Sequence, residues 1–340
     1  MPAAAPVDLQ PVVAAALRTI EGARLAPGQY ARYQGPARQA KPQGGRVNPY
    51  GCADAANILY MTGHFPRDLA ERAAWVSALQ AMQDPATGLF HEATHHTYHT
   101  TAHCIAALQL FDARPLYPLT ALHFLREPGA LEHFLDGLDW LKTPWPAAHQ
   151  GAGLYAALVI TEEVTPAWED RYFAWLWSEE DPVTGFWRRG YQKLDGPGTT
   201  APPFHHLAGS FHYLFNHEHA RRPLRYPTAM IDSTLRIRLN HEWPFGHTLG
   251  FAEIDWVYSL TRPLRQSGHR HGDIKAALQG LATEYAAYLQ GLVARETVPF
   301  DDMHNLFGAM CALAELQAAL PGQLRTDRPL HLVLDRRPFI

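Results

Sequence analysis

The chain has 340 residues, of which 47% are hydrophobic and only 18% are charged, with 29 Lys and Arg against 33 Asp and Glu. So few charges beside so many apolar residues exclude a disordered protein and provide for a large buried core. The slightly acidic balance argues against a nucleic-acid partner, because a phosphate backbone needs a dense basic surface.

The cysteine content and the N-terminus favour a cytoplasmic protein. Cys52, Cys104 and Cys311 lie far apart in the sequence and cannot all pair, which favours a reducing compartment over a disulfide framework. The first ten residues carry no basic, apolar leader. No run of about 18 apolar residues occurs that would predict a membrane span.

Two kinds of predicted helix alternate along the chain. Outer helices have a single apolar face, as in 67–82, where the apolar positions recur every three or four residues. They are expected at 11–23, 67–82, 130–141, 167–178, 227–238 and 272–292. Inner helices are apolar on nearly all sides and rich in small residues, which predicts burial all round. They are expected near 52–62, 101–112, 147–160, 206–217, 250–262 and 303–320.

This alternation predicts an all-α fold in which six helical hairpins close into an (α/α)6 toroid. An open solenoid would need polar capping repeats at both ends, and the sequence shows none. We expect residues 1–320 to form one catalytic domain and residues 321–340 a C-terminal tail. Within the tail, residues 331–334 alternate in the manner of a strand.

Two turns of similar sequence follow outer helices. Residues 83–90 read Gln-Asp-Pro-Ala-Thr-Gly-Leu-Phe, and residues 180–187 read Glu-Asp-Pro-Val-Thr-Gly-Phe-Trp. Asp-Pro ends a helix, Gly permits the turn, and the aromatic residue after it packs back. A structural turn is the simplest interpretation of both segments.

These turns resemble segments of two families of α/α toroids. Gln83, Gly88 and Phe90, with Glu180, Gly185 and Trp187, look like degenerate copies of the QW motif of terpenoid cyclases. Residues 83–90, followed by the small-residue segment 101–111, are also similar to six-hairpin glycosidases such as unsaturated glucuronyl hydrolases. The resemblance implies a toroid that hosts hydrolases, lyases, epimerases or cyclases.

In such a toroid the inner helices run the same way, so their N-termini meet at one end, where we expect the pocket. Ten of the twenty histidines fall in the loops that lead to this end. Ionisable residues near these N-termini are the candidate catalytic groups, and the aromatic residues and His304 nearby are the candidate substrate-binding groups. The catalytic candidates are Asp54, His103, His149, His206, Glu253, Asp255 and Asp302; the binding candidates are Tyr98, Trp145, Trp187, Phe204, Trp243 and His304.

The leading hypothesis is a carbohydrate-active enzyme for a small or oligomeric sugar. A glycoside hydrolase needs two carboxyl groups roughly 5 to 9.5 Å apart, for which Asp54 with Glu253 or Asp255 is the expected pair. A lyase or epimerase would instead use His103, His149 or His206 with Tyr98 to move a proton. This hypothesis includes neither a cofactor nor a metal.

Two alternative enzyme classes remain open, beside a helical scaffold without catalytic activity. An isoprenoid cyclase or prenyltransferase would use the aromatic interior to stabilise carbocations, but the DxDD acid motif of such cyclases is absent. Residues 91–95 match HExxH, the zinc motif of metalloproteases. Because Gly88 lies just upstream and 95–101 is a poor helix former, we do not expect the helix that this motif requires. A metal-dependent enzyme using some of His91, His95, His99 and His103 is the second alternative.

Overall fold

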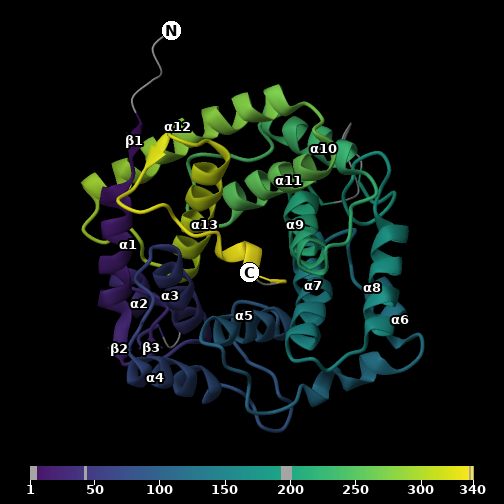
Figure 1. The fold of residues 1–340 in the computed structure, drawn as a ribbon, viewed down its shortest axis with the longest axis horizontal. Helices are drawn as coiled ribbons and strands as arrows, with labels where there is room; N and C mark the ends of the chain where they lie inside the picture. Colours follow the sequence, from purple (N-terminus) through teal and green to yellow (C-terminus); the bar gives the residue numbers. More distant parts are fainter. Residues whose placement is uncertain (1–5, 42–43, 193–200, 337, 340) are drawn as a thin grey trace. The chain divides into compact units, whose positions relative to one another are not determined.

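The computed structural model describes residues 6–41, 44–192, 201–336 and 338–339. These residues are mostly helical, with a few very short strands, which confirms the all-α prediction (Figure 1). The chain forms two compact units. The first unit comprises Met1–Ala81, Pro244–Val257 and Gly272–Val333, and the second comprises Met82–Trp243, Tyr258–His271 and Leu334–Ile340. No helix in the described ranges combines the length and the apolarity that crossing a bilayer demands.

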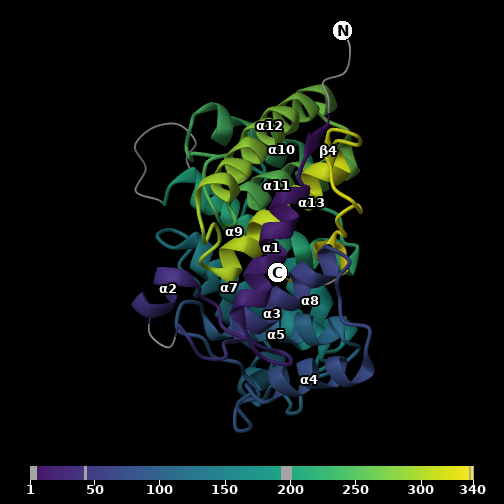
Figure 2. The same cartoon turned by 90° about the vertical axis from the view of Figure 1, so that its left-hand side faces the viewer.

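The first unit is built around helices α3 and α13, which pack against each other. Its helices are α1 (Gln10–Ala23), α2 (Gly35–Ala40), α3 (Pro49–Met61), α4 (Leu69–Gln80), α12 (His271–Arg295) and α13 (Met303–Ala319), together with the first turns of α11 (Ala252–Ser267). Strand β1 (Val7–Asp8) pairs in parallel with β4 (Leu324–Arg325) (Figure 2), and β2 (Arg24–Ala26) pairs antiparallel with β3 (Gln29–Tyr30).

Helix α3 begins at a strong cap and is buried over most of its length. The Asn48 side chain accepts hydrogen bonds from the backbone N–H groups of Tyr50 and Gly51, which satisfies two of the free donors at the helix start. Gly51 is required there, because a Cβ would lie 2.6 Å from the Ala31 backbone. This end of α3 therefore lies close against the segment that follows β3.

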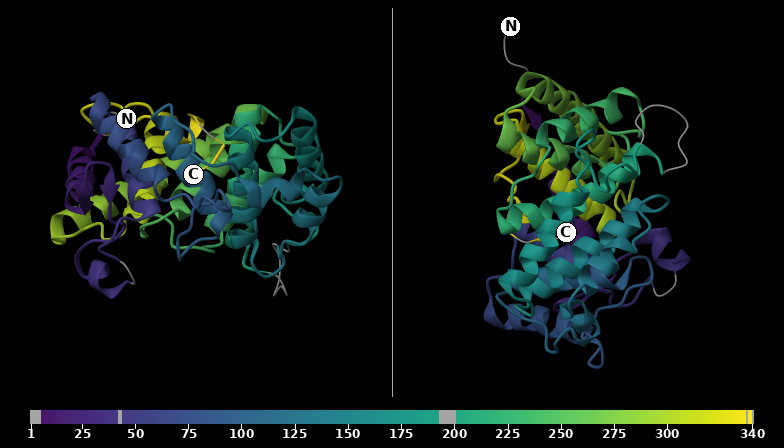
Figure 3. Two further views of the ribbon diagram at one scale, coloured as in Figure 1. Left: turned by 90° about the horizontal axis from the view of Figure 1, so that it is seen from below. Right: turned by 90° about the vertical axis from the view of Figure 1, so that its right-hand side faces the viewer.

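In the second unit, α7 packs between α5 and α9 (Figures 1 and 3). The unit contains α5 (Thr97–Leu110), η1 (Thr120–Arg126), α6 (Ala130–Asp136), α7 (Pro144–Ile160), α8 (Pro166–Glu179), α9 (Pro203–Ala220), α10 (Pro227–Leu239), the rest of α11 and most of η2 (Val333–Arg336). Small residues allow the close approach: a Cβ on Gly153 would lie 2.9 Å from Tyr98 O, and one on Gly209 would lie 2.8 Å from Pro144 O.

The helix positions follow the sequence pattern closely, and two segments differ. Each expected inner and outer helix is present within a few residues of its predicted range. The outer helix predicted at 130–141 ends at Asp136, where Gly137 follows. The strand suggested at 331–334 is wrong, because residues 333–336 form a short 3₁₀ helix. Its Asp335 carboxylate accepts a 2.7 Å hydrogen bond from Arg262, whose side chain is buried.

The two similar turns have the same local structure. Gln83 forms an isolated antiparallel β-bridge with Phe90, and Glu180 forms one with Trp187. Gly88 and Gly185 have φ values of 76° and 72°. These are left-handed values that favour glycine. The structural interpretation of the repeat is therefore confirmed.

Each turn also holds the next segment of the chain through its first residue. The Gln83 Oε1 atom accepts hydrogen bonds from the backbone N–H groups of Leu116 and Tyr117, and its amide donates to Gly88 O and Tyr117 O. The Glu180 carboxylate accepts the backbone N–H groups of Arg225 and Tyr226 in the same manner.

Candidate functional site

A histidine cluster in the second unit brings together three successive inner helices. His99 comes from α5, His149 from α7 and His212 from α9, and His95 lies in the turn before α5. One ligand atom from each of His99, His149 and His212 lies within 4.8 Å of the other two. We call His95, His99, His149 and His212 the histidine cluster.

The rings of the cluster lie in direct contact. The His149 ring centroid is 4.4 Å from that of His99 and 4.7 Å from that of His212. The His95 ring stacks 5.1 Å from His99 and 5.9 Å from His149. His99 and His212 are only 2% and 3% exposed, whereas His149 is half-buried. The cluster is therefore closed on the α5 and α9 sides and reaches solvent beside α7.

His212 is held in one orientation by a backbone contact. Its Nδ1 atom lies 2.8 Å from Ala208 O, so the proton resides on Nδ1 and Nε2 is the basic nitrogen. Burial lowers the pKa of His212 to about 4, because the interior solvates an imidazolium poorly. The ring is therefore neutral at physiological pH.

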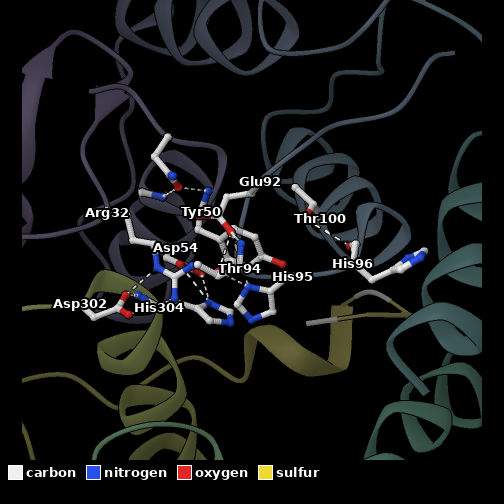
Figure 4. Close-up of polar contacts among 12 residues, drawn as sticks. Arg32, Tyr50, Asp54, Glu92, Thr94, His95, His96, Thr100, Asp302 and His304 are labelled. Atoms are coloured by element: carbon white, nitrogen blue, oxygen red, sulfur yellow. Dashed lines mark hydrogen bonds and ion pairs between the residues drawn. The ribbon is translucent and has the colours of Figure 1, made fainter. Parts of the chain in front are cut away.

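His95 is linked to a carboxylate through a hydroxyl group (Figure 4). The Thr94 hydroxyl donates a 2.6 Å hydrogen bond to Glu92 Oε2, and the same oxygen lies 2.7 Å from His95 Nδ1. Because the hydroxyl has a single hydrogen, its oxygen accepts the bond from an Nδ1–H group. This Glu92–Thr94–His95 relay lies in a turn, and α5 begins only at Thr97. The HExxH segment is thus not helical, as expected, but residues 97–101, for which no helix was expected, form the first turn of α5.

An aromatic face continues from the cluster along the second unit. The Trp145 ring makes edge contacts with His149 at 6.4 Å and with Phe204 at 5.8 Å. Trp243 stacks on Phe204 at 4.3 Å. Trp145 and Trp243 are half-buried, whereas Phe204 is fully buried behind them. The two tryptophans are therefore positioned to offer part of their surface to a ligand.

The remaining candidates of the second unit lie around the cluster or away from it. His103 lies one turn further along α5, with its ring 6.5 Å from His99. Tyr98 is half-buried at the start of α5, and burial raises the pKa of its hydroxyl. His206 is 1% exposed, and burial lowers its pKa to about 4. Trp187 is fully buried and its indole N–H donates to Leu176 O, so it packs the core.

In the first unit, Asp54 and His304 form a buried pair (Figure 4). The Asp54 Oδ2 atom lies 3.1 Å from His304 Nδ1, across the contact of α3 with α13. The edge of the His304 ring meets Tyr50 at 4.5 Å, and Phe251 lies 4.4 Å away. Asp54 is fully buried and His304 is 4% exposed.

Asp302 has a structural task at the start of α13. Its carboxylate caps the helix by accepting the His304 backbone N–H at 2.9 Å. It also accepts two hydrogen bonds from the Arg32 guanidinium, at 2.9 and 3.0 Å (Figure 4). Such bidentate pairs fix the geometry of both partners. These contacts account for the carboxylate at position 302 without catalysis.

Glu253 and Asp255 lie in the first turn of α11 and are fully buried. Burial raises the pKa of Glu253 to about 7, although the Gly246 N–H and the Thr248 hydroxyl stabilise its anion. The carboxyl oxygens of Asp255 make no hydrogen bond within the described residues. Burial, with the charge of Glu253, raises the Asp255 pKa well above its usual value.

The structure brings together groups that the sequence did not single out as a set. Of the predicted metal candidates, His95 and His99 join the cluster, whereas the His91 side chain is exposed and lies 3.8 Å from Asp84. His212 and the Glu92–Thr94 link were not expected. One signal pointed to part of the cluster: His99 and His149 are 50 residues apart, which is close to the period of the helical repeat.

Comparison with known proteins finds no matching protein family, no similar curated protein and no similar solved structure.

Proposed function

We propose that the protein is a carbohydrate-active enzyme whose reaction centre lies at the histidine cluster. The observation that carries this proposal is the Glu92–Thr94–His95 relay, which meets the aromatic face through His149. A basic nitrogen beside a flat apolar surface suits a substrate that combines a weakly acidic C–H bond with the apolar face of a sugar ring.

His95 is the proposed general base. A hydroxyl and a carboxylate behind Nδ1 fix the tautomer and stabilise the imidazolium that forms when Nε2 takes a proton. In the proposed step, His95 removes the proton α to a carboxyl or carbonyl group, and the electron pair of the C–H bond moves onto the carbonyl oxygen. Return of a proton to the opposite face gives epimerisation, whereas loss of a β-oxygen substituent gives elimination.

The aromatic face is the proposed substrate-binding surface. Trp145 and Trp243 are half-buried side chains, and Phe204 supports them from behind. The negative face of an aromatic ring attracts the C–H groups on one side of a pyranose.

The experiment uses the full-length protein and a panel of neutral and uronic-acid oligosaccharides in D₂O. NMR follows deuterium incorporation at the carbon α to the carboxyl group, and absorbance follows the unsaturated product of elimination. We expect exchange with at least one uronide and a loss of about 100-fold or more in His95→Gln.

The matched control for this experiment is His91→Gln, which changes an exposed histidine of the same turn. It should keep the wild-type rate. Absence of exchange across the panel, or full activity in His95→Gln, would reject the proposal. Trp145→Ala should raise KM more than it lowers kcat, and the reverse pattern would remove Trp145 from substrate binding.

Glycoside hydrolysis is the second candidate, favoured by the raised pKa of Glu253, since a general acid must stay protonated near neutral pH. Because Glu253 is fully buried, this candidate requires the 246–248 segment to move away from it. Glycosidase activity that disappears in Glu253→Gln and persists in His95→Gln would select this candidate over the first.

The (α/α)6 toroid belongs to the same proposal. What supports it is the alternation of fully buried and one-sided helices along the chain, which the helix bounds reproduce. In each unit, taken alone, inner helices such as α3 with α13, or α7 with α5 and α9, are packing partners.

A further inference from the structure

We propose that His99, His149 and His212 bind a divalent transition metal ion, with Zn²⁺ as the expected occupant. This inference rests on the same cluster as the proposed function and assigns it a metal, while leaving His95 as the base. One ligand atom from each of three imidazoles, on three different helices, lies within 4.8 Å of the other two.

The geometry is near that of a zinc site. Zn–N bonds of 2.0–2.1 Å in a tetrahedron place the nitrogens about 3.4 Å apart, and the three ligand atoms here lie within 4.8 Å of one another. No gap therefore exceeds the ideal by more than about 1.4 Å, which small rotations of two rings can close. Three protein nitrogens leave a fourth position for water or substrate, as in catalytic rather than structural zinc sites.

A backbone contact orients His212 as metal ligands usually are oriented. A metal-binding imidazole usually donates its other N–H group to a backbone carbonyl or carboxylate, and His212 Nδ1 has that contact with Ala208 O at 2.8 Å. Nitrogen ligands favour zinc, copper, nickel or cobalt and disfavour magnesium and calcium.

The C-terminal tail supplies an apolar wall on one side of the site. The Phe339 ring lies 4.8 Å from that of His99 and 5.8 Å from that of His212. Asn216 of α9 holds this tail by donating a 2.8 Å hydrogen bond to Pro338 O. Because Phe339 is fully buried, it excludes water from the α5 and α9 side. The half-buried His149 leaves the opposite side as the approach for water and substrate.

A bound ion adds to the proposed reaction. As a Lewis acid it would take the developing negative charge on the carbonyl oxygen when His95 removes the α proton. The proton moves to His95, the electron pair moves to the oxygen, and the metal keeps its oxidation state. His95, at 5.1 Å from the His99 ring, lies beside the ligands in a position suited to that task.

The test measures metal binding to the full-length protein without any substrate. After chelator treatment and dialysis, Zn²⁺ is titrated in competition with a chromophoric chelator, and X-ray absorption defines the ligands of the loaded protein. We expect one ion per chain, a submicromolar Kd and three imidazole nitrogens around zinc. His149→Gln and His212→Gln should each weaken binding by about 100-fold or more.

His217→Gln is the matched control, since α9 also carries this second buried histidine. His217 is 1% exposed, its Nδ1 atom lies 3.1 Å from Arg222 O, and burial lowers its pKa to about 4. It thus shares with His212 the burial, a backbone contact through Nδ1 and the lowered pKa, but it lies outside the cluster. Binding should be unchanged in this variant, and an equal loss in both would attribute the effect to damaged packing and overturn the proposal.

The remaining outcomes separate the metal from the proposed function. Substoichiometric binding, an oxygen-rich coordination shell, or wild-type affinity in His212→Gln would each overturn the metal site. X-ray absorption on the unaltered protein decides the question even if the variants fail to fold. Uronide exchange that survives complete metal removal would retain the function and reject the metal's part in it. Tight zinc binding without any carbohydrate activity would retain the metal site and reject the proposed function.

Discussion

Glu180 occupies in the second turn the position that Gln83 occupies in the first. Because Glu180 is a carboxylic acid where Gln83 is an amide, we expect the stability of the folded protein to depend on pH. Both side chains are buried and accept two backbone N–H groups from the next segment. Gln83 shows that one oxygen is enough for both bonds, while its amide donates to two carbonyls. A carboxylate lacks that donor and carries a buried charge. We therefore predict that Glu180→Gln stabilises the protein at neutral pH.

The magnitude follows from the pKa of Glu180, which burial raises from 4.5 to about 7. Below pH 4.5 the carboxyl group is protonated in the folded and unfolded chains alike, so the wild type has its full stability. As the pH rises toward 7, the unfolded chain ionises first and the folded state loses stability. At 1.36 kcal/mol per pKa unit, this loss approaches about 3 kcal/mol above pH 7.

The assay is urea unfolding of the wild type and Glu180→Gln at pH 4, 6 and 8. The difference in the free energy of unfolding should grow with pH by about 3 kcal/mol in favour of the variant, because other titrating groups cancel between the two proteins. Gln83→Glu is the converse variant and should lose stability over the same pH range. A difference that stays constant between pH 4 and 8, or a variant less stable at pH 8, would refute the reasoning.

Three further predictions concern packing and buried charge. Gly185→Ala should cost about 3 kcal/mol or more, because its Cβ would lie 2.3 Å from Met230 N. Gly190→Ala, at a similar φ and with no atom of the described residues within 4 Å of its Cβ, should cost about 1 kcal/mol. Equal losses in thermal unfolding would contradict this. Arg32→Met should cost about 3 kcal/mol by leaving Asp302 unpaired, and adding Asp302→Asn should recover part of it in urea unfolding; additive losses would argue against the pair. Asp255→Asn should match the wild type near pH 3, below the unfolded pKa of 3.8, and exceed it in stability as the pH rises, because the folded pKa of Asp255 is raised. Unfolding curves whose separation does not change with pH would show that the buried carboxyl carries no such cost.

Much of the fold could be predicted because the relevant signals are local. The spacing of apolar residues defines helix faces over a few turns, so α3, α5 and α13 appear near their expected positions. The Asp-Pro and Gly residues of the two turns act through their own backbone angles. The end of α6 was less predictable. Residues 137–141 continue the apolar spacing of a helix, but the helix ends at Asp136.

The candidate site was less predictable, since its members come from helices far apart in the sequence. His149 was expected to act, yet nothing local distinguishes His212 from His217, five residues along the same buried helix. Trp187 has a side chain typical of sugar-binding sites, but its indole N–H donates a hydrogen bond to a backbone oxygen in the core. Asp302 has a side chain that could act as a catalytic acid, but Arg32, 270 residues away in the sequence, donates a hydrogen bond to its carboxylate.

The sequence by itself therefore determined the helices, their buried or one-sided character and the two glycine turns, because these depend on neighbours within a few residues. Only the tertiary structure decided which histidines meet, which tryptophans keep an exposed edge and which carboxyl groups are paired. Those outcomes depend on the rotation of each helix about its axis and on its depth against its partner. A shift of one residue moves a side chain by about 100° around a helix, so small differences in packing separate His212 in the cluster from His217 outside it.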